Sequence, residues 1–424
     1  MSLSLGIDVG TSGIRTAVMD GNTLVSMARA DHWQQDPAGI NASDWWTAVA
    51  ACLDKQVNAL RDLRVNPKTI AAIAVDGTSG SMILTDAHLN PVSPALMYNS
   101  KGFVDEAKRI ATVIEGDHIV KGNNSSLARA MRLISLAYTR PIHLLHQADF
   151  ITAKLIGQGG RSDFNNALKT GFDPEKNCWP DWLAQLIDPT LLPKVHSPGA
   201  ALEQISSQVA EQFGLSKMIT IHAGTTDSIA AFLASAPITE GVAVTSLGST
   251  LAIKFLCKQR IDDPKVGLYS HRLGPLWLVG GASNTGGAVL RAHFTDDELI
   301  KLSAAINPQT PLGLDYYPLN EPGERFPIND PNLQPRLCPR PDNKTDFLKA
   351  ILEGIATIEA RCYVDIEARV GARPSKIYTA GGGAKNPTWT AIRERALGQK
   401  PRISQHSEAA IGVAKLASSQ MPLT

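Results

Sequence analysis

The sequence predicts an α/β protein of two domains that each contain the same pattern of strand, glycine turn and strand. Strand-like apolar runs alternate with helical patterns along the chain, which is typical of α/β proteins. A glycine turn between two strand-like runs occurs once in each half, at 10–13 and at 247–250. At 424 residues the chain is too long for one ordinary core, so two domains of about 200 residues each are expected. We place the boundary near 216–222, which gives domains 1–220 and 221–424.

The first half begins with strand patterns at 3–9 and 14–19. A helical pattern follows from Asp44, capped by Asp44 or Ser43, to Leu60. The run 70–75 is apolar throughout, as expected for a central strand covered on both faces. In open α/β sheets ligands bind at the carboxyl ends of strands. The polar loop that follows therefore supplies three candidate substrate contacts, Asp76, Thr78 and Ser79. The alternative is that this loop is a plain turn.

The remainder of the first half predicts scaffold elements. Helices are expected at 125–137, behind a serine cap, and from His146 to near Gly157, with a polar loop at 162–167. His143 and His146 share no carboxylate or third histidine at ligand spacing, so packing or capping is expected of them and not metal binding.

The second half opens with a strand at 218–222, which leads into Asp227. Eight prolines between residues 311 and 342 predict a rigid, ordered excursion or lid. A long amphipathic helix at about 343–370 and a strand at 376–380 follow it. The pair Asn386-Pro387 is typical of a helix N-cap and first helical residue. A small-residue helix over 407–414 closes the chain and can pack tightly against a neighbour.

The glycine turns indicate phosphate binding, because they let backbone N–H groups converge on an anion without a Cβ in the way. Asp8, at the end of the first strand, can hold Mg²⁺ through water, with Asp227 as its partner. Three glycines at 381–383 allow close approach of a flat ligand or a phosphate. The alternatives are a plain hairpin turn, a helix N-cap for Asp227, and a cap alone for Asn386.

The composition limits the other function classes. A formal net charge of +1 and well-mixed charges argue against nucleic acid or an anionic membrane surface as partner. Five scattered cysteines suggest neither a disulfide framework nor a zinc site, so a reducing cytoplasm is expected. No apolar run reaches the length of a membrane span. We expect a monomer or homodimer.

Taken in order, these blocks resemble the FGGY family of carbohydrate kinases over nearly the full length. Four stretches carry the resemblance: 6–15, 223–227, 246–250 and 380–386. It implies the duplicated actin-like, hexokinase-like ATPase fold of ribonuclease H-like domains, with ATP and sugar in the interdomain cleft. It also implies a kinase that uses ATP and Mg²⁺ to phosphorylate a small-molecule sugar or polyol.

The resemblance further implies roles for single residues. Asp227 matches the catalytic base and Asp8 the magnesium-associated aspartate, and we expect both to hold the metal. We expect the substrate contacts among Asp8, Asp76, Thr78, Ser79 and Asp227, although the loop at 76–80 lacks the residues usual in xylulose and glycerol kinases. The residues that match the nucleotide site are Gly10, Thr11, Ser12, Arg15, Gly248, Ser249, Thr250, Gly286, Gly382, Gly383 and Asn386. The loops at 78–80, 97–99 and 162–174 look like those of short D-ribulose kinases. D-Xylulose, another polyol and a non-catalytic sensor remain alternatives.

Overall fold

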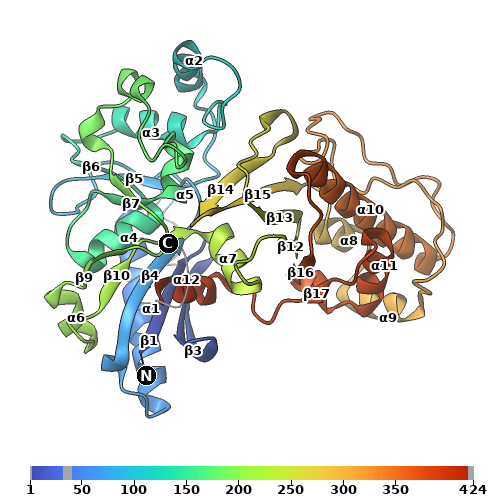
Figure 1. Ribbon diagram of the computed structural model, residues 1–424, viewed down its shortest axis with the longest axis horizontal. Coiled ribbons are helices and arrows are strands. Elements are labelled where there is room, and N and C mark those ends of the chain that lie inside the picture. Colours follow the sequence, from blue (N-terminus) through green and yellow to red (C-terminus); the bar gives the residue numbers. More distant parts are fainter. Residues whose placement is uncertain (1, 32–40, 419–424) are drawn as a thin grey trace. The chain divides into compact units, whose positions relative to one another are not determined.

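The computed structural model describes residues 2–31 and 41–418, which form two compact units (Figure 1). Unit 1 comprises the chain up to Ala234, the segment His271–Pro275 and the chain from Glu408 onward; unit 2 comprises Ser235–Ser270 and Leu276–Ser407. The division expected between residues 220 and 221 differs from this one. The reason is that β10 (Thr220–His222) and β11 (Thr225–Thr226) both pair with a strand of unit 1, so the chain stays in that unit until α7 (Asp227–Ser235).

The sheet of unit 1 has the strand order β3-β2-β1-β4-β10-β9, with β11 also paired to β4. The pairing of β1 is antiparallel with β2 and parallel with β4, so β1 lies in the middle of the sheet. The strands expected at 3–9, 14–19, 70–75 and 218–222 are all present, and β3 is an addition. Their bounds are β1 (Leu3–Val9), β2 (Gly13–Asp20), β3 (Thr23–Asp31), β4 (Ile70–Gly77) and β9 (Ala201–Gln204).

Helices cover this sheet and complete its core. The longest in unit 1, α1 (Ala42–Asp62), buries Trp45, Val49 and Leu53. Its cap is Asn41, whose side chain accepts a hydrogen bond from the Ser43 N–H at 2.9 Å, and not Asp44 or Ser43 as expected. The other helices against this core are α4 (Gln147–Ile156), α6 (Ser207–Phe213) and α12 (Ala409–Ala417).

Two glycines let α12 pack closely, as the small residues of 407–414 predicted. This helix lies against β1, β2 and β4. A Cβ added at Gly6 of β1 would come within 2.0 Å of the Ala410 carbonyl oxygen, and one added at Gly412 within 1.8 Å of the Ala230 carbonyl oxygen of α7. Real Cβ atoms do not approach a carbonyl oxygen that closely. Only glycine at residues 6 and 412 therefore allows β1, α12 and α7 to pack at these distances.

A second apolar cluster of unit 1 surrounds β5 (Met82–Thr85), β6 (His143–His146), α2 (Val104–Val113) and α3 (Ser126–Ser135). Residues 162–167 are not a plain loop as expected. They belong to β7 (Arg161–Asp163), which pairs with β8 (Lys194–His196), and to the short helix α5 (Phe164–Ala167). The helix forms because the Asp163 carboxylate accepts from the N–H groups of Asn165 and Asn166.

The sheet of unit 2 repeats this arrangement, with the order β14-β15-β13-β12-β16-β17. Its first strand β12 pairs antiparallel with β13 and parallel with β16, as β1 does with β2 and β4. The duplication predicted from the two glycine turns is therefore present in the topology. The bounds are β12 (Val242–Leu247), β13 (Leu251–Cys257), β14 (Tyr269–Leu273), β15 (Leu276–Ser283), β16 (Lys376–Ala380) and β17 (Arg402–Ile403).

The core of unit 2 is built on α10 (Lys344–Val370), the helix expected at 343–370. It packs beside α11 (Pro387–Leu397) and α9 (Asp296–Ala305) (Figure 1). The short helix α8 (Gly287–His293) follows β15.

The proline-rich segment 311–342 forms no helix or named strand, yet it is ordered by one buried carboxylate. Glu324, 3% exposed, accepts from Ser283 Oγ at 2.6 Å, Tyr317 OH at 2.8 Å and the Asn284 N–H at 2.7 Å. This segment is therefore bonded to the end of β15, which agrees with the ordered excursion that was predicted.

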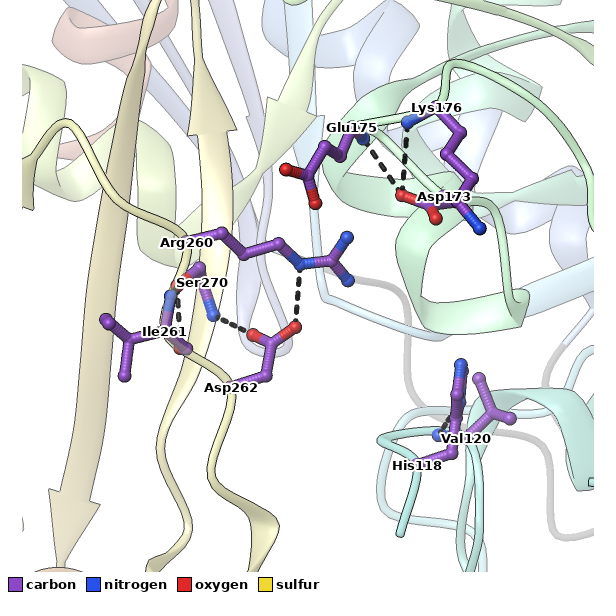
Figure 2. A network of polar contacts seen from close by, with 9 residues as sticks. All are labelled: His118, Val120, Asp173, Glu175, Lys176, Arg260, Ile261, Asp262 and Ser270. Atoms are coloured by element: carbon purple, nitrogen blue, oxygen red, sulfur yellow. Dashed lines mark hydrogen bonds and ion pairs between the residues drawn. The ribbon is translucent and has the colours of Figure 1, made fainter. Parts of the chain in front are cut away.

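Side-chain hydrogen bonds also order loops of both units, and Figure 2 shows one example from each. In unit 2, Asp262 pairs with Arg260 Nε at 2.8 Å and accepts from the Ser270 N–H at 2.8 Å. In unit 1, Asp173 accepts from the N–H groups of Glu175 and Lys176. These bonds fix the loops around Asp262 and Asp173.

Candidate functional site

Three strands of unit 1 bring acidic residues together at one edge of its sheet. Asp8 of β1 lies opposite Asp76 of β4, and Asp76 lies opposite Thr225 of β11. Asp227, two residues after Thr225, is the first residue of α7. Because the three strands run parallel here, their carboxyl ends meet. Asp227 was expected in the second domain, whereas the structure groups it with Asp8 and Asp76 in unit 1.

Burial dominates the electrostatics of this group. Asp76 is 0% exposed, and its carboxyl group lies within hydrogen-bonding reach of the Asp8 carboxyl group. Burial raises the pKa of Asp76 well above its ordinary value, and the negative charges of Asp8 and Asp227 raise it further. Burial also raises the pKa of Asp8. The hydrogen bond with Asp76 opposes that shift, and so does Arg15, whose NH1 lies 3.3 Å from Asp8 Oδ2. The cluster therefore holds buried carboxylates that a cation would stabilise.

Arg15 lies between two carboxylates. Besides Asp8, its Nε is 3.5 Å from Glu408 Oε2, just before α12. No feature of the sequence pointed to Glu408, since it is 393 positions away from Arg15. Arg15 was expected to contact the nucleotide; in the structure it balances the charge of Asp8.

In the first glycine turn, the side chains of Thr11 and Ser12 are exposed, but the N–H of Gly10 is already bonded within the turn. The N–H of Gly10 donates to the Gly13 carbonyl at 3.1 Å, inside the turn. Thr11 and Ser12 are exposed at its tip. The expected convergence of consecutive N–H groups on an anion therefore does not include the N–H of Gly10.

The loop after β4 presents one of its two candidate hydroxyls and buries the other. Thr78 is 4% exposed, and its Oγ1 donates to Gln147 Oε1 at 2.7 Å. Its N–H donates to the same oxygen at 3.0 Å. Ser79 is half-buried with its side chain free of these bonds. Thr78 was expected to contact substrate; the structure uses its hydroxyl inside the protein, because α4 places Gln147 directly behind the loop.

Asp227 begins α7 and keeps part of its surface exposed. Its Oδ1 accepts from the Ser228 N–H at 2.6 Å, which supports the first turn of the helix. The preceding strand is fixed because Asn165 Nδ2 donates to Thr225 Oγ1 at 3.0 Å. Asp227 is thus the first residue of its helix, where the capping alternative would have placed it before the helix, and it also lies beside Asp76.

The second glycine turn, in unit 2, is joined to the start of α8. Gly248 accepts from the Gly287 N–H at 2.9 Å, and Ser249 accepts from the Ala288 N–H at 3.0 Å. Gly286 has φ +144°, and a Cβ there would lie 2.8 Å from the Ser249 carbonyl oxygen. The structure therefore brings together four of the residues predicted for the nucleotide site. Gly248, Ser249 and Thr250 form the exposed turn, and Gly286 is buried beneath it.

The three-glycine loop lies at the end of the neighbouring strand. Gly381 has φ +87°, and a Cβ there would lie 2.6 Å from the Leu247 carbonyl oxygen, at the end of β12. A Cβ at Gly383 would meet the Trp389 ring at 2.6 Å. At Gly382 it would meet nothing within 4 Å, so Gly382 faces open space. A flat ligand has room beside Gly382, while Gly381 and Gly383 are glycines for packing.

Asn386 uses both ends of its carboxamide within the protein. Its Oδ1 accepts from the Trp389 N–H at 3.0 Å as the N-cap of α11, and its Nδ2 donates to Ser303 Oγ at 2.8 Å. The capping prediction is confirmed. A nucleotide contact at Asn386 would have to share one of these atoms.

A buried ion pair that the sequence did not indicate supports both loops of unit 2. Arg393 and Glu359 form two bonds, Nε to Oε2 at 2.6 Å and NH2 to Oε1 at 2.7 Å, with side chains 1% and 0% exposed. Arg393 NH1 donates to Thr379 Oγ1 of β16 at 2.9 Å, and Thr245 Oγ1 of β12 donates to Glu359 Oε1 at 2.6 Å. These strands precede the three-glycine loop and the glycine turn, respectively.

The acidic cluster suits a hard cation held by few protein ligands. Among residues 2–31 and 41–418, no three His, Cys, Asp or Glu side chains have the arrangement of a metal site. Mg²⁺ does not require one, because it keeps several waters and binds one or two carboxylates together with substrate phosphates.

No helix in the described part of the chain is long and apolar enough to cross a membrane.

Known proteins match this chain over nearly its full length. The model of the N-terminal domain of the FGGY family of carbohydrate kinases matches residues 3–234, and that of the C-terminal domain matches 243–421. The xylulose kinase of Streptomyces coelicolor is 26% identical over 443 residues, covering 98% of this chain and 87% of that protein. That of Staphylococcus epidermidis is 22% identical over 440 residues, covering 97% and 87%.

Solved structures share the fold. A xylulose kinase from Rhodospirillum rubrum superimposes with a TM-score of 0.84 at 19% identity, covering 99% of this chain and 91% of that one. The Plasmodium falciparum glycerol kinase with ADP superimposes with a TM-score of 0.83 at 16% identity, covering 98% and 89%. The predicted duplicated, actin-like kinase fold is confirmed.

Proposed function

Because this chain belongs to the FGGY family of carbohydrate kinases, and is thus an ATP-dependent sugar kinase, we propose that it phosphorylates a primary hydroxyl of a ketopentose, D-ribulose before others. The product would be D-ribulose 5-phosphate. The observation that carries the proposal is the position of Asp227, partly exposed at the start of α7 beside two buried carboxylates. D-Ribulose is favoured by the small hydroxyl loop at 78–80 and by the segment 97–99.

In the proposed reaction Asp227 is the general base. Its carboxylate accepts the proton of the sugar hydroxyl as that oxygen attacks the γ-phosphorus of ATP; the new O–P bond forms, the bond to the bridging oxygen breaks, and ADP leaves. Asp8 and Asp227 would hold Mg²⁺, which neutralises charge on the phosphates when bound. Arg15 keeps Asp8 from carrying an unbalanced charge.

The nucleotide contacts are proposed for the exposed parts of the glycine turns. In unit 1 these are Thr11 and Ser12. In unit 2 they are the exposed turn 248–250, behind which Gly286 is buried, and the open face at Gly382. Gly383 and Asn386 then act mainly by shaping the three-glycine loop. Ser79, and not Thr78, is the hydroxyl of the first loop that is available to a sugar.

A second candidate substrate is D-xylulose, since relatives at 22–26% identity are named xylulose kinases. The two sugars differ only in configuration at C3, so discrimination depends on hydrogen bonds placed by the loops.

The test is ADP release from Mg-ATP with D-ribulose, D-xylulose, L-ribulose, ribitol, xylitol and glycerol, against a blank without sugar. A dominant kcat/KM for D-ribulose supports the proposal, and a dominant value for D-xylulose replaces it.

The role of Asp227 has its own test. Removing a general base costs about 10²–10⁴ in rate, so Asp227→Asn should nearly abolish turnover and leave ATP binding largely intact. Asp296→Asn is the matched control, because Asp296 is also an acidic residue in the first turn of a helix, α9. Near-normal kcat in Asp227→Asn would refute the assignment.

A further inference from the structure

Arg129 of α3 is a buried cation that pairs with no carboxylate. It is 1% exposed, and among the described residues no acidic side chain forms an ion pair with it. Its guanidinium donates mainly to backbone carbonyls: NH1 to Gly80 at 2.7 Å, and NH2 to Tyr98 at 2.8 Å, Asn124 at 3.2 Å and Ser100 at 3.4 Å. NH1 also lies 3.5 Å from the Ser126 hydroxyl oxygen. Burial lowers the pKa of Arg129 to about 10, so it stays charged at neutral pH. A charge held this way costs desolvation energy without the return of an ion pair.

The carbonyls that Arg129 binds belong to separate loops. Gly80 follows Ser79, and Tyr98 begins the exposed segment 98–99. Gly80 has φ +89°, and a Cβ there would lie 2.4 Å from Ser126 Oγ and 3.0 Å from Arg129 NH1. The backbone at residue 80 therefore lies directly against α3. A planar guanidinium is suited to this, because it donates from two nitrogens in fixed directions.

A chain of hydrogen bonds joins the same two loops from the other side. The Tyr98 N–H donates to Ser81 Oγ at 3.0 Å, and Ser81 Oγ lies 2.6 Å from Thr78 Oγ1. Thr78 Oγ1 donates to Gln147 Oε1, so the proton between the two hydroxyls comes from Ser81. Ser81 and Gln147 are 0% exposed. Every link in this chain is fixed in direction.

We propose that Arg129 is a positioning residue for the sugar: by bonding Gly80 and Tyr98 at once, it fixes the segment 78–81 against 98–100 and so sets the place of Ser79. Arg129 does not itself touch substrate, since it is buried behind both loops. This inference rests on the proposed function, in which Ser79 contacts the sugar. It explains why a charged side chain is kept where an apolar one would avoid the desolvation cost.

The same helix provides a matched control. Arg132 lies one turn further along α3, and its guanidinium, like that of Arg129, is 5.6 Å from the Phe103 ring. It pairs with Glu106 of α2, NH2 to Oε2 at 2.9 Å, and bonds neither loop. Arg132→Gln thus removes an arginine from the same helix and ring without releasing residues 78–81.

The experiment compares wild type, Arg129→Lys, Arg129→Gln and Arg132→Gln by steady-state kinetics with D-ribulose, D-xylulose and Mg-ATP, after circular dichroism has established equal folded fractions. A misplacement of about 1 Å can cost about 10²-fold. We expect Arg129→Gln to raise the sugar KM about tenfold or more while the ATP KM stays within about twofold. Arg129→Lys should have a sugar KM between those of wild type and Arg129→Gln. A lysine ammonium keeps the positive charge but cannot donate from two nitrogens in fixed directions. Arg132→Gln should leave the sugar KM unchanged.

Ser81→Ala is the second variant, in case Arg129→Gln does not fold. It removes the central link between Tyr98 and Thr78 and should raise the sugar KM about threefold or more. The inference is overturned if folded Arg129→Gln has a sugar KM within twofold of wild type. If only Ser81→Ala folds, the same result in that variant overturns it. An equal rise in the ATP KM does so too. If wild type itself shows no sugar-dependent ADP release, the proposed function fails, and this inference with it.

Discussion

Replacing Arg393 by methionine should strongly destabilise unit 2, because it leaves the Glu359 carboxylate buried without its partner. The substitution removes two bonds to Glu359 and the bond to Thr379 Oγ1. Both side chains of the pair are at most 1% exposed, so water cannot replace the lost partner. Breaking a buried pair by removing one member costs about 3–5 kcal/mol. For a domain of this size that corresponds to a fall in Tm of about 6–20 °C.

The physical reasoning also predicts how the loss is recovered. In Arg393→Met combined with Glu359→Gln, no charge is left buried, and the glutamine can still accept from Thr245 Oγ1. The double variant should therefore be more stable than Arg393→Met alone, by about 1–3 kcal/mol. Because Thr245 and Thr379 lie on the strands that lead to the glycine loops, Arg393→Met should also weaken ATP binding.

The assay is urea unfolding followed by circular dichroism, on wild type, both single variants and the double variant. Arg373→Met is the control: Arg373 also pairs with a glutamate in unit 2, but its side chain is 81% exposed. Exposed pairs contribute about 0–1 kcal/mol. A loss below about 1 kcal/mol in Arg393→Met, or a double variant no more stable than it, would refute the reasoning.

Three further predictions concern packing and pH. Gly412→Ala should destabilise unit 1 by about 1–3 kcal/mol, since its Cβ would lie 1.8 Å from the Ala230 oxygen; a thermal melt checks this. Gly286→Ala, strained at φ +144°, should lower Tm and raise the ATP KM, whereas Gly382→Ala, with open space around its Cβ, should leave Tm unchanged. Burial lowers the pKa of His146 to about 3, so below its ordinary pKa of about 6.5 the unfolded chain alone binds the proton, and stability falls by about 1.4 kcal/mol per pH unit. His146→Gln should remove that dependence between about pH 6.5 and 4.5 in urea titrations, and an unchanged slope would contradict it.

Much of the fold was predictable because its signals are local. The turn at 10–13 and the turn at 247–250 each lie between two apolar runs, so one short stretch of sequence contains the whole pattern. The long helix at 344–370 was found from its periodicity. The exceptions were also local: the cap of α1 is Asn41, and Asp163 turns the expected loop at 162–167 into a strand end and a short helix.

The sequence by itself determined the repeated strand, turn and strand, the acidic residues at strand ends, and the cap at Asn386. Only the tertiary structure decided which of these groups are available. Thr78 faces Gln147, 69 positions away, and Glu359 meets Arg393 across 34 positions. Such partners are chosen by the packing of helices on a sheet, which depends on the volume and direction of many side chains together. No pattern within a single segment contains that information.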